Sequence, residues 1–392
     1  MKLPPFGYCN FTRELVCSMS LYPNGLFIGW DSNKQKRDYI KKGWYSPRNI
    51  LPTRFQMVND TVFLAIPRFR CGVPFSLGFV QLNDYCKAEP IMHPYPSWGI
   101  NKAEEGHAGI VSAVDLQIDN NLILWVLDVG IIDTLTQPKF IAPPKIVGFC
   151  LNTGKMKFNF NLLELVNEHS RLQYIQVEVT GSKTYLYVSD AGTNSLIVWD
   201  TARSHAFKVQ LPPQIMEGCN SDKADVLYIA LLQMQCSKKS LYFTYLNSQS
   251  MYHVDTHRLR GQAWHGVVES DGQKPGRIVI LGTDRYETMF FRLRGSPDVF
   301  LWNAMNEFRP ENLYLAESIE GGRLPTHVTL GGKGLIWSLE SNFPDFLGPP
   351  DKQCNAIGPS VKIHPIVRFC DEYMNATTAI KHEKRWCSNQ KK

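Results

Sequence analysis

Two aspartates end similar apolar runs, and they are the first side chains to consider for chemistry. Asp128 ends the run LILWVLD and Asp190 ends TYLYVSD, and each is followed by one residue and then a glycine. Two carboxylates that converge on one channel could perform acid–base chemistry or bind a cation. An aspartate placed before x-Gly also caps a turn through the backbone, and this structural role is the stronger interpretation.

The other reactive residue types form no recognisable site. The 10 histidines contain no HxH or HExxH pattern, so each is read as an ordinary loop or surface residue, although a histidine base for proton abstraction stays an alternative. No GxSxG, P-loop or dinucleotide-binding motif is present. The 10 cysteines form no CxxC and match no zinc spacing. We therefore expect no metal and no cofactor, and the residues by themselves do not indicate an enzyme.

Six strand-like runs recur along the chain. They are TVFLAIP, LILWVLDVG, TYLYVSDAG, SLYFTYL, DVFLWNA and GLIWSLE, and their first residues lie 61, 62, 56, 58 and 36 positions apart. Short apolar runs bounded by turn residues are typical of buried strands, and their repetition indicates a repeated all-β architecture. A six-bladed β-propeller is the economical solution, with a β-sandwich or a pair of β domains as the alternative.

The chain divides into three segments by composition. Residues 1–45 are expected to form an irregular N-terminal extension that packs on the propeller, 46–370 the propeller, and 371–392 a basic tail. Two stretches inside the propeller read as loops: 84–110, rich in Pro, His and Gly, and 251–275, which is polar and allows a short helix. We expect the ring to close between the last strand, 361–370, and the first blade.

Composition limits the partners. The chain has 392 residues, 44% hydrophobic and 12% aromatic, which is ample for a folded core. The net charge of +6 is partly concentrated in the last dozen positions, and such a tail is usually solvated. No motif for nucleic acid occurs, and no apolar run is long enough to span a membrane.

Sequons and cysteines favour a secreted protein. Asn10, Asn59 and Asn375 each begin an Asn-x-Thr glycosylation sequon, and an even number of cysteines suits disulfides in an oxidising compartment. The N-terminus shows no apolar signal-peptide core. The two explanations are an incomplete start and a cytosolic protein, and we favour the incomplete start.

Several phrases together resemble one insect family. FLAIPR with GVPFSL, LWVLDVG, PPKIVGFCLNTGK, YLYVSDAG with SLIVWD, SLYF and GLIWSLESNFP occur in the order seen in the yellow/major royal jelly proteins, between about Arg48 and Cys370. GVPFSLG and RGSPDVFLWN look closest to the yellow-g group. The resemblance implies a secreted six-bladed propeller. Some family members convert dopachrome in melanin synthesis, some bind biogenic amines at the ring centre, and the yellow-g group is tied to eggshell.

Three family cysteines are absent at matching positions. Asn121, Gly181 and Leu301 stand where relatives often carry cysteine. The loss of the first two together is what the loss of one disulfide would look like. Sequence proximity suggests four pairs, although connectivity cannot be deduced from sequence: Cys9–Cys17, Cys71–Cys86, Cys219–Cys236 and Cys354–Cys370.

The resemblance also implies a ligand site. In amine-binding members a Thr, an Asn and an aromatic residue hold the ligand, and the matching positions are Thr326, Asn342 and Phe343. A glycine between the Asn and the aromatic of the family phrase is missing, so the alternative is that Asn342 caps a turn and Phe343 packs. Such a site suits an aromatic amine through stacking, cation–π contact and hydrogen bonds. His327 is the histidine nearest to this candidate pocket.

These expectations lead to three functional hypotheses. The leading one is a secreted, non-catalytic protein of an insect extracellular matrix, most plausibly the eggshell, with matrix proteins as partners. The second is a dopachrome-converting enzyme, and the third is a binder of biogenic amines. An aromatic amine or a catechol-derived molecule is the small-molecule partner that the resemblance suggests.

Overall fold

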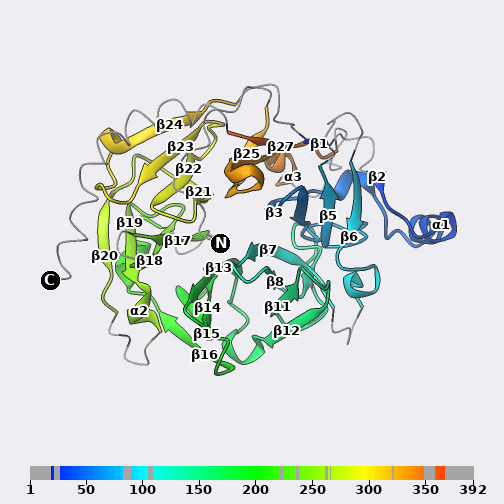
Figure 1. The fold of residues 1–392 in the computed structure, drawn as a ribbon, viewed down its shortest axis with the longest axis horizontal. Helices are drawn as coiled ribbons and strands as arrows, with labels where there is room; N and C mark the ends of the chain where they lie inside the picture. Colours follow the sequence, from blue (N-terminus) through cyan, green and yellow to red (C-terminus); the bar gives the residue numbers. More distant parts are fainter. Residues whose placement is uncertain are drawn as a thin grey trace.

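The chain forms a ring of six antiparallel blades, seen down its axis in Figure 1. This computed structural model describes residues 19–21, 27–82, 90–104, 109–219, 225–234, 238–260, 264, 266–319, 322–347 and 358–366. The all-β propeller expected from the repeated strand signals is therefore confirmed.

The strands of each blade follow one another from the inner strand outward. The first contains β3 (Arg54–Val58), β4 (Thr61–Ala65), β5 (Leu77–Gln81), β6 (Ile91–Pro94) and a short fifth strand, β2 (Phe27–Ile28). The second contains β7 (Ala113–Ile118), β8 (Ile123–Asp128), β11 (Lys145–Cys150) and β12 (Met156–Asn161). The third contains β13 (Leu172–Thr180), β14 (Lys183–Asp190), β15 (Ser195–Asp200) and β16 (His205–Gln210).

The remaining blades follow the same order. The fourth contains β17 (Leu227–Gln233), β18 (Lys239–Tyr245), β19 (Ser250–Asp255) and β20 (Glu269–Gln273). The fifth contains β21 (Ile278–Thr283), β22 (Thr288–Leu293), β23 (Val299–Asn303) and β24 (Leu313–Glu317). The sixth contains β25 (Leu324–Leu330), β26 (Ile336–Ser341), β27 (Val361–Pro365) and β1 (Met19–Leu21).

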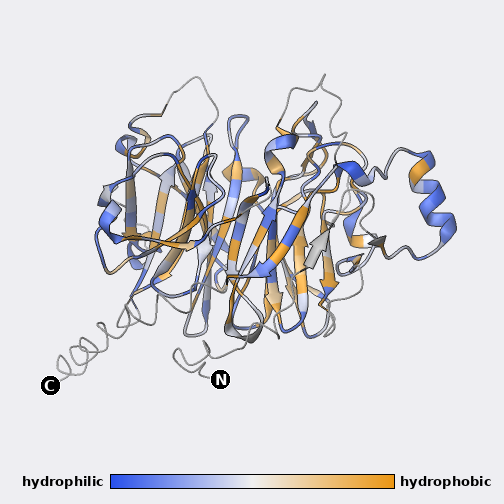
Figure 2. Cartoon of the chain, turned by 90° about the horizontal axis from the view of Figure 1, so that it is seen from above, coloured by the Kyte–Doolittle hydropathy of each residue, from blue (hydrophilic) through white to orange (hydrophobic). Residues whose placement is uncertain are grey.

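Small elements decorate the ring. A hairpin of β9 (Ile131–Ile132) and β10 (Lys139–Phe140) joins β8 to β11. The helix α1 (Asn33–Lys41) projects from the ring, with no buried residue (Figure 2). The other helical elements are α2 (Thr256–Leu259), α3 (Phe343–Phe346), η2 (Pro47–Asn49), η3 (Gly99–Asn101), η4 (Leu163–Leu165), η5 (Pro213–Met216), η7 (Pro310–Asn312) and η8 (Gly332–Gly334). Within the described ranges, no helix is both long and apolar enough to cross a membrane.

Apolar side chains fill the spaces between neighbouring blades. One cluster joins the fourth, fifth and sixth blades around Trp302, and another joins the sixth and first blades around Phe55 and Leu339. The six inner strands lie next to one another around the axis and close the ring where β25 meets β3. Burial between blades is what no single four-stranded sheet could achieve, so the blades stabilise one another.

The N-terminal segment closes the ring. β1 pairs antiparallel with β27, Met19 lying opposite Ile363, and so supplies the outer strand of the sixth blade. β2 pairs in parallel with β6 of the first blade. The expected closure between the last strand and the first blade is therefore corrected: a strand from the 1–45 segment pairs with the last strand, whose edge would otherwise be open.

The six strand signals occupy two positions in the blades. Five of them correspond to the second strand, namely β4, β8, β14, β18 and β26, whereas DVFLWNA corresponds to β23, the third strand of its blade. The second strand there is β22, at Thr288–Leu293. This difference explains why the last sequence interval was so short.

Two stretches expected to be loops contain outer strands. The fourth strands β6 and β20 lie inside 84–110 and 251–275, and the third strand β19 (Ser250–Asp255) overlaps the start of the second stretch. β20 has no buried residue, and β6 alternates exposed with buried positions. An outer strand faces water over most of its surface, so its residues are polar and the apolar signature of a strand is absent.

Candidate functional site

A cavity of about 860 Å³ opens at the end of the channel where the inner strands begin. Its walls are mostly apolar and come from the starts of the inner strands, from the segments that precede them and from the connection between β8 and β11. They include Val114, Val129, Ile131, Val166, Leu172, Val226 and Val279. This size and apolar character are typical of a pocket for a small organic molecule.

Arg54 stands on the base of this cavity. The guanidinium donates to the carbonyl oxygen of Thr326, and its Nε lies 3.8 Å from a carboxylate oxygen of Asp115. Its Cζ also lies 4.8 Å from the ring centroid of Tyr174, a cation–π distance. These three contacts hold the buried cation in one orientation. Burial raises the pKa of Asp115 to about 6, although Arg54 acts against that rise.

A second arginine and two tyrosines complete the base. Arg292 donates through Nε to the carbonyl oxygen of Pro325 at 2.8 Å, and burial lowers its pKa. Tyr174 and Tyr228 stack with ring centroids 5.2 Å apart. Burial raises the pKa of both phenols, which keeps them protonated and able to donate hydrogen bonds.

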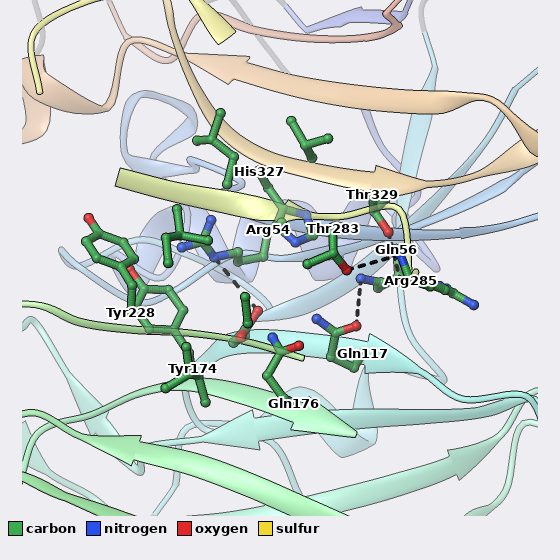
Figure 3. Close-up of a pocket in the computed structure, with 17 residues that line it drawn as sticks. Arg54, Gln56, Gln117, Tyr174, Gln176, Tyr228, Thr283, Arg285, His327 and Thr329 are labelled. Carbon is green, nitrogen blue, oxygen red and sulfur yellow. Dashed lines mark hydrogen bonds and ion pairs between the residues drawn. The ribbon is translucent and has the colours of Figure 1, made fainter. Parts of the chain in front are cut away.

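A layer of polar side chains lies in the narrow channel beyond the base, and Figure 3 shows it. The Gln56 amide nitrogen donates to the Gln117 oxygen at 3.2 Å, and Arg285 and Thr329 both donate to the Gln56 oxygen. Gln176 lines the same space. This layer separates the wide cavity from the opposite end of the channel.

The structure places two of the three residues implied by the resemblance at this cavity. Thr326 and Phe343 both line it. Thr326 lies at a bulge in β25, and its hydroxyl donates to the Leu339 carbonyl at 3.3 Å. Phe343 begins α3, and its ring lies 5.5 Å from that of Phe69, which also lines the cavity.

Asn342 does not line the cavity. It is buried, and its amide nitrogen donates to Asp345 at 3.0 Å and to the Gly358 carbonyl at 2.9 Å. Its oxygen accepts from the Ser360 backbone nitrogen at 2.8 Å. These bonds tie α3 to the segment before β27, so Asn342 has a structural role, although its side chain makes no cap hydrogen bond at the start of α3, unlike the turn cap that the alternative supposed. Ligand binding by the predicted set remains a prediction.

His327 lies in the narrow channel, outside the wide cavity. Its Nδ1 accepts from the Phe55 backbone nitrogen at 3.4 Å, and its ring meets the Phe55 ring edge-on. Burial and nearby Arg54 lower its pKa well below the usual value, so the imidazole is neutral. It is not placed to take a proton from a molecule in the wide cavity.

Asp128 and Asp190 are structural. Asp128 accepts from the backbone nitrogens of Val111, Ser112 and Gly130 and lies 3.3 Å from Lys145 Nζ. Asp190 likewise accepts from the backbone nitrogens of Gly192 and Arg171. A Cβ at Gly130, whose φ is +68°, would lie 1.8 Å from the Ala142 carbonyl oxygen. The Asp-x-Gly motif therefore fixes turns, as its stronger interpretation held.

The modification sites lie partly within the described residues. Asn59 is exposed in the turn between β3 and β4, whereas Asn10 and Asn375 fall outside the described ranges. Among the described residues, Cys71, Cys150 and Cys219 form no disulfide with one another. Every predicted disulfide pair contains at least one cysteine outside the described ranges, so the pairings stay predictions.

Sequence reasoning missed the residues that form the base of the cavity. Arg54, Tyr174 and Tyr228 each stand near the start of an inner strand, and Arg54 and Tyr174 are followed by one apolar residue and then by a glutamine of the polar layer. The triplets RFQ, DLQ and YIQ repeat this pattern in three successive blades and would have located the channel. Arg292, on a second strand, carries no comparable signal.

Comparison with known proteins gives the chain a family. The family model described as "Major royal jelly protein" matches residues 111–350, more than half of the chain. The chain belongs to the major royal jelly protein family. It is 25% identical over 328 residues to Major royal jelly protein 1 of Apis mellifera, with 77% of this chain and 73% of that protein covered.

The family's yellow branch and a solved propeller give further matches. Protein yellow of Drosophila subobscura is 24% identical over 352 residues, which cover 83% of this chain and 61% of that protein. The chain thus spans less than two thirds of that relative. The α-L-arabinofuranosidase of Fusarium graminearum is similar with a TM-score of 0.50 and 11% identity over 88% of this chain and 97% of that chain. The last likeness concerns the fold alone.

Proposed function

We propose that this protein is a ligand-binding propeller whose wide cavity holds a small aromatic molecule bearing a carboxylate or another strong hydrogen-bond acceptor. The observation that carries the proposal is the combination of an apolar cavity of about 860 Å³ with arginine and tyrosine donors at its base. Apolar walls favour a flat aromatic body, and the donors at the base favour an acceptor at one end of it.

The charges of the cavity favour an acid over an amine. Arg54, Arg171 and Arg292 line it, whereas Glu168 is the one carboxylate among the described residues that do so. The Glu168 side chain is 86% exposed, so water screens its charge. An ammonium group at the base would meet two cations there. A biogenic amine remains the alternative that the family resemblance suggests.

The lining also favours binding over turnover. No histidine or cysteine occurs among the described residues that line the wide cavity. The two phenols have raised pKa values and are poor bases near neutral pH. Conversion of dopachrome, whose quinone and carboxylate would suit the same donors, is the enzymatic alternative.

We further propose that the protein acts outside the cell, in an insect extracellular matrix such as the eggshell, with matrix proteins as partners. The support for secretion is the sequon at Asn59, which is exposed at a hairpin turn. The eggshell role rests on the yellow-g resemblance. Expression behind a secretion leader tests the first step: the N59Q variant is expected to lose one glycan by mass.

The binding proposal is tested with two catechols that carry opposite charges on their side chains. Calorimetric titration with 3,4-dihydroxyphenylacetate and with dopamine presents the same catechol ring with a carboxylate or an ammonium. We expect the acid to bind at least about tenfold more tightly than dopamine. Arg171→Gln is expected to remove roughly half of the free-energy difference between the two ligands. Tyr228→Phe, which deletes one hydroxyl, is expected to weaken binding of the acid by about fivefold.

Three results would decide among the hypotheses. Equal or tighter binding of dopamine would overturn the acid preference and restore the amine binder. Accelerated decay of dopachrome over buffer, lost in Tyr228→Phe, would establish the enzyme instead. Absence of binding by both ligands, together with association of the secreted protein with isolated eggshell, would leave the matrix role without a ligand.

A further inference from the structure

The channel has a second opening at the end opposite the wide cavity. This narrow opening has a volume of about 100 Å³. It shares Gln117, Gln176, Thr283 and Arg285 with the polar layer (Figure 3), and Lys239 and Gln233 line it farther out. The wide cavity and this opening share no lining residue.

Arg285 reaches this opening through an unusual backbone. It lies in the turn between β21 and β22 with φ of 68°, a left-handed conformation that is uncommon for residues other than glycine, asparagine and aspartate. Buried Asp284 fixes the turn by accepting from the backbone nitrogens of Tyr286, at 2.8 Å, and Thr288, at 3.1 Å. The turn thereby directs the guanidinium into the channel.

The Arg285 guanidinium has more donors than protein acceptors. Within the described residues its side chain makes one hydrogen bond, from Nη2 to the Gln56 oxygen at 3.2 Å. A guanidinium carries five N–H groups. Burial lowers the pKa of Arg285, which reflects the cost of holding this cation away from water. Arg285 is half-buried, and a partly desolvated cation with few protein acceptors is stabilised by an anion.

Two glutamines of the opening also have donors to spare. The Gln117 oxygen accepts from Gln56, and the Gln176 oxygen accepts from the Leu231 backbone nitrogen at 3.2 Å. The acceptor atom of each amide is thus engaged within the protein, whereas no protein partner is recorded for either amide nitrogen within the described ranges. The side chains that face this opening therefore offer mainly hydrogen-bond donors.

The nearby acid and lysine have their own partners. Asp119 lines the opening, but its two oxygens accept from the backbone nitrogens of Asn121 and Ile123 and from the Trp125 indole. It reduces the positive potential at Arg285 without occupying the guanidinium. Lys239 donates to the Val179 carbonyl and lies 4.0 Å from Glu178. Its charge adds to the potential of the opening.

We propose that the narrow opening is a second binding site, which takes an oxyanion group (a carboxylate, phosphate or sulfate) between Arg285 and the amide nitrogens of Gln117 and Gln176. The volume admits a group of that size together with a water molecule, since one water occupies about 30 Å³. Charge-assisted hydrogen bonds from a guanidinium suit planar and tetrahedral oxyanions alike. The site is independent of the ligand proposed for the wide cavity.

The test is calorimetric titration of the full chain with sodium phosphate, sodium sulfate and sodium acetate at constant ionic strength set by sodium chloride. We expect saturable binding of at least one oxyanion, and the three titrations separate an inorganic oxyanion from a carboxylate. Arg285→Asn removes the cation with a residue that tolerates positive φ. It is expected to weaken binding by about tenfold or more, and Arg285→Lys by less.

Further variants separate this site from other causes. Gln117→Glu keeps the shape and the acceptor for Gln56 but replaces a donor by a charge, so it is expected to abolish binding. Arg203→Gln removes one cation from a side chain that is 75% exposed and serves as the charge-matched control. The proposal is overturned if no oxyanion binds more tightly than chloride. It also fails if Arg285→Asn and Gln117→Glu bind normally, or if Arg171→Gln at the wide cavity alone abolishes binding.

Discussion

Buried carboxylates in this propeller differ in whether a cation accompanies them. Asp128 has Lys145, and Asp115 has Arg54 at 3.8 Å. Asp284 is buried, one of its oxygens has no hydrogen-bond partner, and no ion pair to it is recorded among the described residues. Burying a charge is therefore costly at Asp284, and its pKa is raised to about 6, first by desolvation.

The raised pKa of Asp284 predicts a dependence of stability on pH. The folded protein holds this proton more tightly than the unfolded chain, in which the aspartate has its ordinary pKa of 3.8. The free energy of unfolding therefore falls as the pH rises from about 4 to 6. Asp284→Asn removes this loss. Relative to the wild type, its free energy of unfolding is expected to rise by roughly 1–3 kcal/mol between pH 4 and pH 8. Urea denaturation at both pH values measures it, and a constant difference would contradict it.

Removal of the charge from Asp128 should have the opposite effect. Asp128→Asn weakens three backbone hydrogen bonds and leaves Lys145, whose side chain is 8% exposed, without its carboxylate. We expect a loss of about 2–4 kcal/mol in urea denaturation. Asp38→Asn on the exposed surface of α1 is the control, expected within about 0.5 kcal/mol of wild type. A loss equal to the control's would show that the turn does not depend on the charge.

At the scale of elements, outer and inner strands are specified differently. β8 and β15 are buried at every position, and β14 at every position after Lys183, so each contains a continuous apolar run. Outer strands such as β20 have little buried surface, and inner strands alternate apolar residues with the polar side chains of the channel. Five of the six second strands were thus predictable, whereas β22, β6, β19 and β20 were not.

The closing strand β1 is the element whose contribution is easiest to isolate. It covers the edge of β27 through Met19, Ser20 and Leu21. A chain that begins after residue 21 is expected to lose roughly 2–4 kcal/mol of stability and to aggregate on heating, because β27 then presents an unpaired edge. A chain that begins after residue 17 is the control, because it keeps β1 intact. Equal melting temperatures for the two chains would show that the pairing of β1 with β27 does not stabilise the ring.

At the scale of the whole molecule, the channel is lined by cations at both ends. Arg54, Arg171 and Arg292 line the wide cavity, and Arg285 and Lys239 line the narrow opening. With a net charge of +6 for the whole chain, this distribution attracts anions from a distance.

This distribution predicts that ligand affinity depends on salt. Binding of 3,4-dihydroxyphenylacetate is expected to weaken several-fold between about 50 and 500 mM sodium chloride, because the Debye length falls well below 10 Å over that range. Catechol, the neutral parent, is the control and is expected to change little. An affinity for the acid that is independent of salt would contradict an electrostatic contribution.

The sequence by itself determined the class of fold, the family resemblance and the Asp-x-Gly turns, because these depend on short contiguous patterns: a buried strand, and a side chain that accepts from the backbone two residues on. It also named Thr326 and Phe343, which reach one cavity. Only the tertiary structure decided that Asn342 ties a loop, that His327 is neutral and outside the wide cavity, and that Arg54 lies beside Arg292. Those facts depend on which residues the closure of the ring brings together from positions far apart in the chain.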